Sequence, residues 1–255
     1  MSQLQGSAIV SGGASGLGRA CVERLHADGL AVLIADVNDD AGDELAGSLG
    51  ERVVYRHTDV TDADSVQAAA TQAAGLDPAG LRVSIGCAGI GRAERLLGKR
   101  GPHSVELFRT VIDVNLVGMF QLLRAAAAVM SENEPLDGGR GVHISTASVA
   151  AFEGQVGQVA YSASKGAIVA MTIAAARDLS QFGIRVCTIA PGLFLTPMMM
   201  ELPEEVQESL GKSVPFPQRL GRPEEFADLA LAIVRNPMLN GETVRLDGAL
   251  RLAPR

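Results

Sequence analysis

The sequence predicts an α/β fold, a doubly wound and mostly parallel seven-stranded sheet with helices on both faces. Short β-branched runs alternate with stretches of helical spacing, and a glycine-rich turn follows the first run. The chain has 255 residues, 47% of them hydrophobic, which suits one large domain spanning residues 1–255. The seven predicted strands are residues 8–10, 31–35, 53–56, 83–85, 142–145, 184–189 and 243–246.

The helices between these strands are predicted from apolar periodicity. In the last one, Leu229, Ala230 and Ile233 follow Phe226 on one face, and Pro223 stands at its start. Looser segments are expected at residues 96–103, 133–141 and 196–220. Ligands of open α/β sheets bind beyond the carboxyl ends of the strands, so the residues that follow each strand are the candidate site.

Composition and charge narrow the function classes. Lys and Arg number 22 against 29 Asp and Glu, so we expect no direct nucleic-acid partner and no membrane partner. Three widely separated cysteines indicate free thiols and no metal site. The first residues lack a leader pattern, and no run of about 18 uncharged apolar residues occurs. We therefore expect a cytoplasmic protein, or a mitochondrial matrix protein if the source is eukaryotic.

The glycine-rich turn is the first candidate binding site. Ser11 ends the first strand, and Gly12, Gly16 and Gly18 follow in a GxxxGxG pattern that leads into helix-compatible residues 19–26. Such a turn brings main-chain N–H groups and a helix N-terminus up to a pyrophosphate. A plain glycine-rich turn is the alternative, and the position between strand and helix favours the dinucleotide site.

An acidic residue closes the second strand. Asp36 lies 18 residues past Gly18, at the distance where a carboxylate accepts hydrogen bonds from the adenosine ribose. It would also repel a 2′-phosphate, and the neighbouring Gly13, Val37 and Asn38 carry no positive charge. NAD is therefore the predicted cofactor. The alternative for Asp36 is a solvated loop residue or a helix cap.

Two further strand ends carry candidates for the cofactor. Asp59 and Val60 follow the third strand, where the carboxylate suits either the adenine edge or a helix cap. Cys87, Ala88 and Gly89 follow the fourth strand, and such small side chains let the main chain approach a cofactor. For Cys87 itself, the role of a small buried apolar side chain is favoured over that of a nucleophile.

The second half of the chain carries the candidate chemistry. Tyr161 and Lys165 lie one helical turn apart on the same face. A nearby ammonium favours the phenolate, so we expect a lowered tyrosine pKa and a phenol that exchanges a proton with an alcohol or a carbonyl. A tyrosine and a lysine on an ordinary helix surface are the alternative.

Two polar residues accompany this pair. Ser148 lies 13 residues before Tyr161, and its hydroxyl could hold the substrate oxygen or bond only to the main chain. Asn115 falls inside a helical stretch, where asparagine is mildly unfavourable. Its amide could orient Lys165 through a water, or it could be a satisfied buried side chain.

Taken together, these motifs resemble the short-chain dehydrogenase/reductase family in order and spacing. They are the glycine loop, the string at residues 113–116, Ser148, Tyr161 with Lys165, and Pro191-Gly192. A narrower likeness, to the type 2 3-hydroxyacyl-CoA dehydrogenases of that family, runs from about Gly6 to Leu252. It rests on residues 146–157, 161–166, 188–194 and 240–249.

The resemblance implies a Rossmann fold, NAD and a homotetramer. It makes Tyr161 the acid/base, and Lys165 the residue that lowers the tyrosine pKa and holds the nicotinamide ribose. Ser148 would position the substrate oxygen, and Asn115 would complete a proton relay. The cofactor residues that the motifs and the resemblance give are Ser11, Gly12, Ser15, Gly16, Leu17, Gly18, Asp36, Asp59, Val60, Cys87, Ala88, Gly89, Tyr161, Lys165, Pro191, Gly192, Phe194 and Thr196.

Two positions depart from the family pattern. Gly86 stands where asparagine is usual, so a side chain that commonly ties the fourth strand to its neighbour is missing, and we expect a less rigid strand end. Ser11 replaces the usual threonine and keeps the hydroxyl.

The substrate is expected to meet the segment after the sixth strand. Leu195 and Met198 are the candidate contacts besides Ser148 and Tyr161, and methionines give an adaptable apolar wall. Residues 196–220 would form a lid, unless these side chains pack in the core or between subunits.

The expected activity is hydride transfer between NAD and a secondary alcohol, preferably an (S)-3-hydroxyacyl-CoA. Another NAD-linked dehydrogenase of hydroxysteroids or short-chain alcohols is the alternative within enzymes, because these share fold and motif. A non-catalytic dinucleotide-binding scaffold is the alternative outside them, and the intact Ser148, Tyr161 and Lys165 argue against it.

Overall fold

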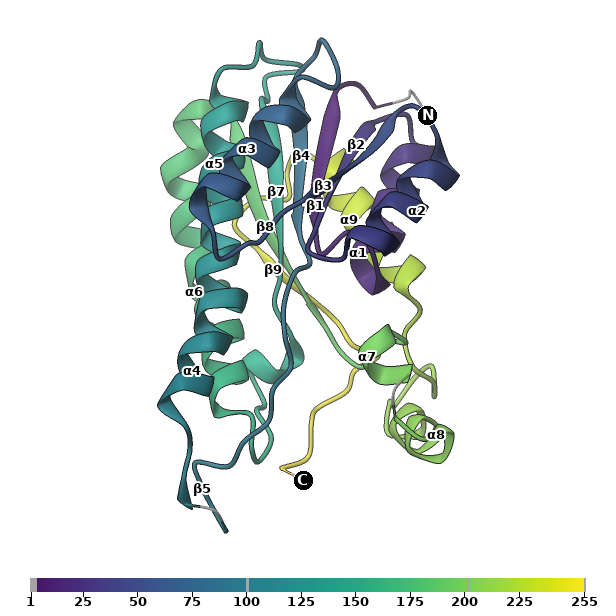
Figure 1. The fold of residues 1–255 in the computed structure, drawn as a ribbon, viewed down its shortest axis with the longest axis vertical. Coiled ribbons are helices and arrows are strands. Elements are labelled where there is room, and N and C mark those ends of the chain that lie inside the picture. Colours follow the sequence, from purple (N-terminus) through teal and green to yellow (C-terminus); the bar gives the residue numbers. More distant parts are fainter. Residues whose placement is uncertain (1–3, 100, 201, 255) are drawn as a thin grey trace.

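The sheet has seven parallel strands in the order β3-β2-β1-β4-β7-β8-β9 (Figure 1). The computed structural model describes residues 4–99, 101–200 and 202–254. All seven predicted strands are confirmed. They are β1 Ser7–Ser11, β2 Ala31–Asp36, β3 Val53–His57, β4 Leu81–Gly86, β7 Gly141–Thr146, β8 Ile184–Pro191 and β9 Thr243–Leu246.

Helices cover both faces, as predicted for a doubly wound sheet (Figure 1). One face packs against α1 Gly16–Ala27, α2 Asp39–Leu49 and α9 Pro223–Arg235. The other face packs against α3 Ala63–Ala74, α5 Gly118–Ser131 and α6 Val159–Leu179, with α4 Val105–Ile112 beyond them. The strand order changes direction between β1 and β4, and such a switch point opens a crevice at the carboxyl ends of the strands.

Helix α9 shows why these segments form helices. It begins at Pro223, and the carboxylate of Glu225 accepts a 2.7 Å hydrogen bond from the main-chain N–H of Arg222, which caps the first turn. Phe226, Ala230 and Ile233 are buried against the sheet and α1, as the apolar periodicity predicts.

The segments predicted as loose loops are more ordered than the sequence indicates. Residues 96–103 contain a small hairpin of β5 Leu97–Gly98 and β6 Gly101–Pro102. Residues 196–220 contain α7 Pro197–Met200 and α8 Glu204–Lys212. These elements are short and expose one or more sides, so their apolar periodicity is too weak to predict.

Two helical stretches are apolar enough to cross a membrane by length and composition, which the sequence analysis does not predict. They are Val105–Ser131 and Val159–Phe182, with mean hydropathies of 1.4 and 1.3. Helices α5 and α6 within them pack on the sheet, so core burial accounts for part of this apolarity. The remainder is exposed, as Phe120 of α5 and Ile173 of α6 are.

Gly86, where the family usually has asparagine, is filled from a neighbouring helix. A Cβ on Gly86 would lie 2.6 Å from Cε of Met119 and closer still to its Sδ. Met119 belongs to α5 and is buried. The methionine therefore occupies the volume that a side chain at position 86 would need. The strand end is packed, in contrast to the less rigid end that the sequence analysis expects.

Gly86→Ala is expected to lower the free energy of unfolding by about 1–3 kcal/mol, because the new methyl group overlaps a buried side chain. Met119→Ala alone should cost about 2–5 kcal/mol through the cavity that it leaves. The double variant should lose less than the sum of the two single variants, because the new methyl group then meets no side chain and fills part of that cavity. Urea denaturation of the two single variants and the double variant measures the coupling. Additive losses would show that the two positions do not share this space.

Candidate active site

The predicted site residues gather at the carboxyl edge of the sheet. Strands β1, β4, β7 and β8 run parallel, so the segments that follow them meet at one edge. These segments carry the glycine loop, residues 87–89, Ser148 and the Pro191-Gly192 turn. Helix α6 brings Tyr161 and Lys165 to the same edge, next to the end of β7.

Lys165 is the fixed point of the site. Its side chain is buried, and Nζ donates a 2.7 Å hydrogen bond to the carbonyl oxygen of Thr146, the last residue of β7. Nζ also lies 5.8 Å from the centre of the Tyr161 ring. Burial lowers the pKa of Lys165 to about 8, and the Cys87 thiol opposes this shift. The amine therefore keeps its charge at neutral pH.

Tyr161 and Ser148 are hydrogen-bonded to each other. Burial raises the pKa of Tyr161, and the bond with Ser148 works in the opposite direction. The predicted lowering of this pKa is therefore wrong for the structure, because desolvation of the phenol outweighs the effect of its neighbours. A neutral phenol at physiological pH is ready to donate a proton.

Ser148 is held by the turn that it starts. Its hydroxyl accepts a 3.1 Å hydrogen bond from the main-chain N–H of Ala150 and caps the short 3₁₀-helix η2 Val149–Ala151. Main-chain bonding, the alternative weighed for a loop serine, is thus present together with the bond to Tyr161. The hydroxyl faces the phenol because η2 fixes it there.

Asn115 lies in the π-helix η1 Asp113–Val117, which joins α4 to α5. It is fully buried, and its amide exchanges two hydrogen bonds with the main chain of Ile90, at 2.8 and 3.0 Å. Its Nδ2 also donates to Oγ of Ser164 at 3.2 Å. A Cβ on Gly89 would lie 3.2 Å from Asn115 Oδ1 and 3.7 Å from Lys165 Nζ, so Asn115 and Lys165 flank the same glycine.

The glycine loop fits a dinucleotide. Gly12 and Gly16 have φ of +64° and +53°, which favour glycine, and a Cβ on Gly12 would lie 2.6 Å from the main-chain nitrogen of Ala88. Ser15 makes no side-chain cap, and the first turn of α1 carries no acidic residue. This helix N-terminus therefore presents main-chain N–H groups that suit a pyrophosphate. Gly18 packs against Gly12, Ser11 is buried, and Leu17 packs on the core.

Asp36 closes β2 beside this loop. Its carboxylate accepts a 3.0 Å hydrogen bond from the N–H of Ala14 and a 3.1 Å bond from the N–H of Asn38. The carboxylate therefore shapes the glycine loop and lies next to it. This is the position from which an acid meets an adenosine ribose.

Asp59 and Val60 have local contacts. Oδ1 of Asp59 accepts hydrogen bonds from the N–H and hydroxyl of Thr61, both at 2.8 Å. Asp62, not Asp59, caps α3. The Val60 side chain is buried against Gly118, so adenine could meet only its exposed atoms and main chain.

Cys87 has a thiol partner that the sequence analysis missed. Its side chain is hydrogen-bonded to Cys21 of α1 and accepts a 3.6 Å bond from the hydroxyl of Thr146. The bond to Cys21 lowers the pKa of Cys87, and Thr146 and Lys165 act in the same direction against burial. The two cysteines are far apart in the chain, so their spacing gave no sign of this contact.

The segment after β8 reaches the glycine loop from the other side. Main-chain hydrogen bonding extends β8 into the turn, where the Gly192 N–H donates to Leu246 at 2.9 Å. The Phe194 ring is buried in the core, edge-on to Phe226 at 6.4 Å. Thr196 lies 3.7 Å from the position of a Cβ on Gly16, and Leu195 is partly exposed. The side chain of Met198 lies outside the described residues.

Comparison with known proteins assigns the family. A model of the short chain dehydrogenase family matches residues 7–207. The chain is a short-chain dehydrogenase. Among known proteins, the 3-hydroxyacyl-CoA dehydrogenase type-2 of Drosophila melanogaster is 53% identical over 96% of this chain and 97% of the relative. The human protein of that name is 52% identical over 97% and 95%.

A solved relative has the same fold. The crystal structure of 3-hydroxyacyl-CoA dehydrogenase type-2 from Mycobacterium avium is 47% identical, with a TM-score of 0.94 over 98% of this chain and 97% of that one. This short-chain dehydrogenase is therefore an oxidoreductase, and its family uses nicotinamide dinucleotides. Among the residues described for it, no three His, Cys, Asp or Glu side chains gather as metal ligands.

Asp36→Asn separates the charge of this carboxylate from its hydrogen bonding to the loop, because the amide oxygen can still accept from Ala14. We expect the KM for NAD to rise by about tenfold and the KM for NADP to fall, since the repulsion of a 2′-phosphate is removed. Steady-state kinetics with both cofactors measures this. Equal changes for NAD and NADP would contradict a ribose contact.

Proposed function

We propose that the protein is an NAD-dependent (S)-3-hydroxyacyl-CoA dehydrogenase that interconverts 3-hydroxyacyl-CoA and 3-oxoacyl-CoA. The observation that carries the proposal is the junction of Ser148, Tyr161 and Lys165 at the carboxyl edge of the sheet, beside a glycine loop that fits a dinucleotide. The type-2 relatives of about half identity give the substrate class.

The cofactor would lie along the crevice from the glycine loop to Lys165. Asp36 would meet the adenosine ribose, the N-terminus of α1 the pyrophosphate, and residues 87–89 and 191–196 the nicotinamide half. When bound, NAD accepts or supplies the hydride. Lys165 would reach the nicotinamide ribose while Nζ keeps its bond to Thr146.

The protein's part in the chemistry is proton transfer and orientation. Ser148 would donate a hydrogen bond to the substrate oxygen, and the Tyr161 phenol would protonate that oxygen during reduction. In oxidation the phenolate would take the hydroxyl proton as the hydride leaves. Because burial raises the pKa of Tyr161, the phenol is protonated at neutral pH, which is the form that reduction needs. Oxidation needs the phenolate, so its rate should increase at alkaline pH. Asn115 would support Lys165 from across Gly89.

The acyl part of the substrate would lie under residues 196–220. Leu195 is partly exposed at the start of this segment, and α7 and α8 carry further exposed apolar side chains, Met200, Leu202 and Val206. An apolar segment that joins the carboxyl edge of the sheet to α8 suits a lid over a carbon chain. Leu195 and Met198 are the contacts that we propose.

We also propose a homotetramer built partly on the outer face of α4, α5 and α6. Phe120 and Phe182 are exposed at this face, and α4 exposes Val105 and Phe108. A hollow of about 340 Å³ lies between α5 and α6 on it. Adjacent exposed apolar side chains of this size are typical of contacts between subunits.

Tyr161→Phe is expected to lower kcat with acetoacetyl-CoA and NADH by about 100- to 10,000-fold, because the proton donor is lost. NADH binding, measured by fluorescence titration, should change little. In the unaltered enzyme, the oxidation rate should rise with pH well above neutrality.

A panel of CoA esters and hydroxysteroids tests the substrate. Turnover of steroids alone would overturn the acyl-CoA assignment. If the protein binds NADH but converts none of these substrates, a scaffold role would be favoured.

Phe120→Glu is expected to dissociate the oligomer, because it places a charge in the proposed apolar interface. Light scattering after size exclusion should move from four times the 26.5 kDa chain mass to a smaller species. Met238→Glu is the control, since Met238 is an exposed apolar residue on the turn after α9, the helix that packs on the opposite face of the sheet. A tetramer that survives Phe120→Glu would exclude this face.

A further inference from the structure

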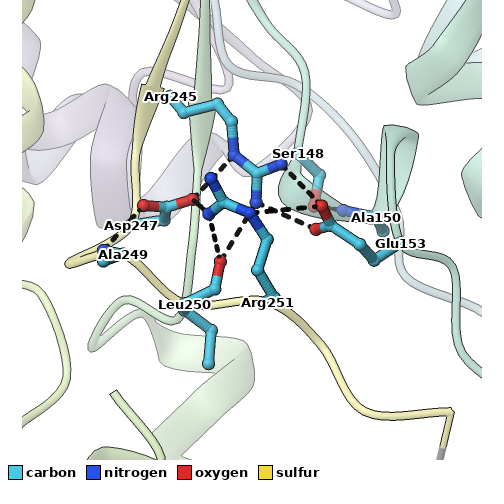
Figure 2. A network of polar contacts seen from close by, with 8 residues as sticks. All are labelled: Ser148, Ala150, Glu153, Arg245, Asp247, Ala249, Leu250 and Arg251. Carbon is cyan, nitrogen blue, oxygen red and sulfur yellow. Dashed lines mark hydrogen bonds and ion pairs between the residues drawn. The ribbon is translucent and has the colours of Figure 1, made fainter. Parts of the chain in front are cut away.

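A group of charged side chains links the segment after Ser148 to the end of β9 and the tail beyond it (Figure 2). At its centre, Arg245 donates from Nη1 and Nη2 to the two oxygens of Glu153, at 2.7 and 2.9 Å. Its Nε donates to Asp247 at 2.7 Å, and its guanidinium lies 4.9 Å from the centre of the Phe152 ring. These residues lie in the segments 146–157 and 240–249 of the narrower likeness, but none of them is among the predicted site residues.

On one side, the network is bonded to the turn that holds Ser148. The N–H of Glu153 donates to the carbonyl oxygen of Val149 at 3.0 Å, and that of Phe152 does so at 2.9 Å. Val149 is the first residue of η2, and Ser148 is its cap. Glu153 and Phe152 are therefore continuous in main-chain bonding with the turn that aims the serine hydroxyl.

On the other side, the network reaches the turn after β8. In the sheet, Arg245 pairs with Ala190, and Gly192 packs so closely on Asp247 that a Cβ there would lie 2.9 Å from it. Arg251 adds a 3.1 Å bond to Asp247. Arg245 thus links Glu153, in the segment after η2, to Asp247, which packs on the turn after β8.

The charges in the network reinforce one another. Arg245 lowers the pKa of Glu153, and Glu153 and Asp247 raise that of Arg245. Both members of the bidentate pair are only partly exposed, with side-chain accessibilities of 21% and 26%. A bidentate pair fixes orientation as well as distance, which an isolated surface ion pair does not.

We propose that Glu153 and Arg245 are positioning residues that hold Ser148 against Tyr161. This inference rests on the proposed role of Ser148. The pair contacts neither the glycine loop nor Asp36, and the packing of Asp247 on Gly192 does not involve Glu153. A change at Glu153 should therefore act on turnover and leave cofactor binding nearly unchanged. The hydroxyl would drift from the phenol when the pair is broken, since η2 would keep its internal bonds but lose its anchor to β9.

The test is a double-mutant cycle in NADH-dependent reduction of acetoacetyl-CoA. Glu153→Gln removes the charge at nearly constant volume and is expected to lower kcat by about tenfold or more, with the KM for NADH unchanged within about twofold. The rise of the oxidation rate with pH should shift to higher pH, because the bond to Ser148 holds down the pKa of Tyr161. In the Ser148→Ala background, Glu153→Gln should have no further effect on kcat.

Asp77→Asn is the matched control, because it breaks the 3.0 Å pair with Arg52 far from the site and should leave kcat unchanged. Unfolding midpoints are measured for all variants, so that only folded enzyme is compared. A normal kcat in Glu153→Gln overturns this inference but not the proposed function. So does an equal loss of kcat on Glu153→Gln in the unaltered and the Ser148→Ala backgrounds. Normal kcat in Ser148→Ala overturns the role of Ser148 and this inference with it.

Discussion

The hydrogen bond from Lys165 to the carbonyl oxygen of Thr146 fixes the geometry on which the site depends. It ties α6 to the end of β7 through a buried amine, and it sets Tyr161 beside the turn that Ser148 starts. A buried ammonium without partners would be costly, so the site depends on this carbonyl to keep the charge in place. The same charge faces Cys87 and, across Gly89, the amide of Asn115.

Close packing of small residues gives the cofactor half its shape. Gly12 lies against the main chain of Ala88, Gly18 against that of Gly12, and Gly16 against the ring of Pro197, so three segments from different parts of the chain approach one another closely. Asp36 adds an acceptor at the edge of this surface. The crevice is therefore formed largely by main chain, which suits the recognition of phosphates and ribose more than of any particular side chain.

Much of the fold was predictable because buried parallel strands produce β-branched runs and the helices that cover them produce apolar stripes. The glycine loop and the Ser148, Tyr161 and Lys165 motif were predictable for a similar reason, since each needs its own residue type. The partner of Lys165 was not, because it is a main-chain carbonyl that any residue carries. The upward pKa of Tyr161, the Cys21–Cys87 contact and the Glu153–Arg245 pair depend on burial and on distant contacts. Compartment and lid stay predictions from the sequence.

The π-helix that carries Asn115 has a consequence for how this protein can be altered. It widens one turn between α4 and α5, and a wide turn of this kind accommodates one residue more than a regular α-helical turn. Deleting one residue there would turn the wide turn into a regular α-helical turn, and Asn115 would lose the main-chain geometry that sets its amide against Ile90. Chimeras that exchange α4 for that of another enzyme therefore have to preserve the residue count across 113–117.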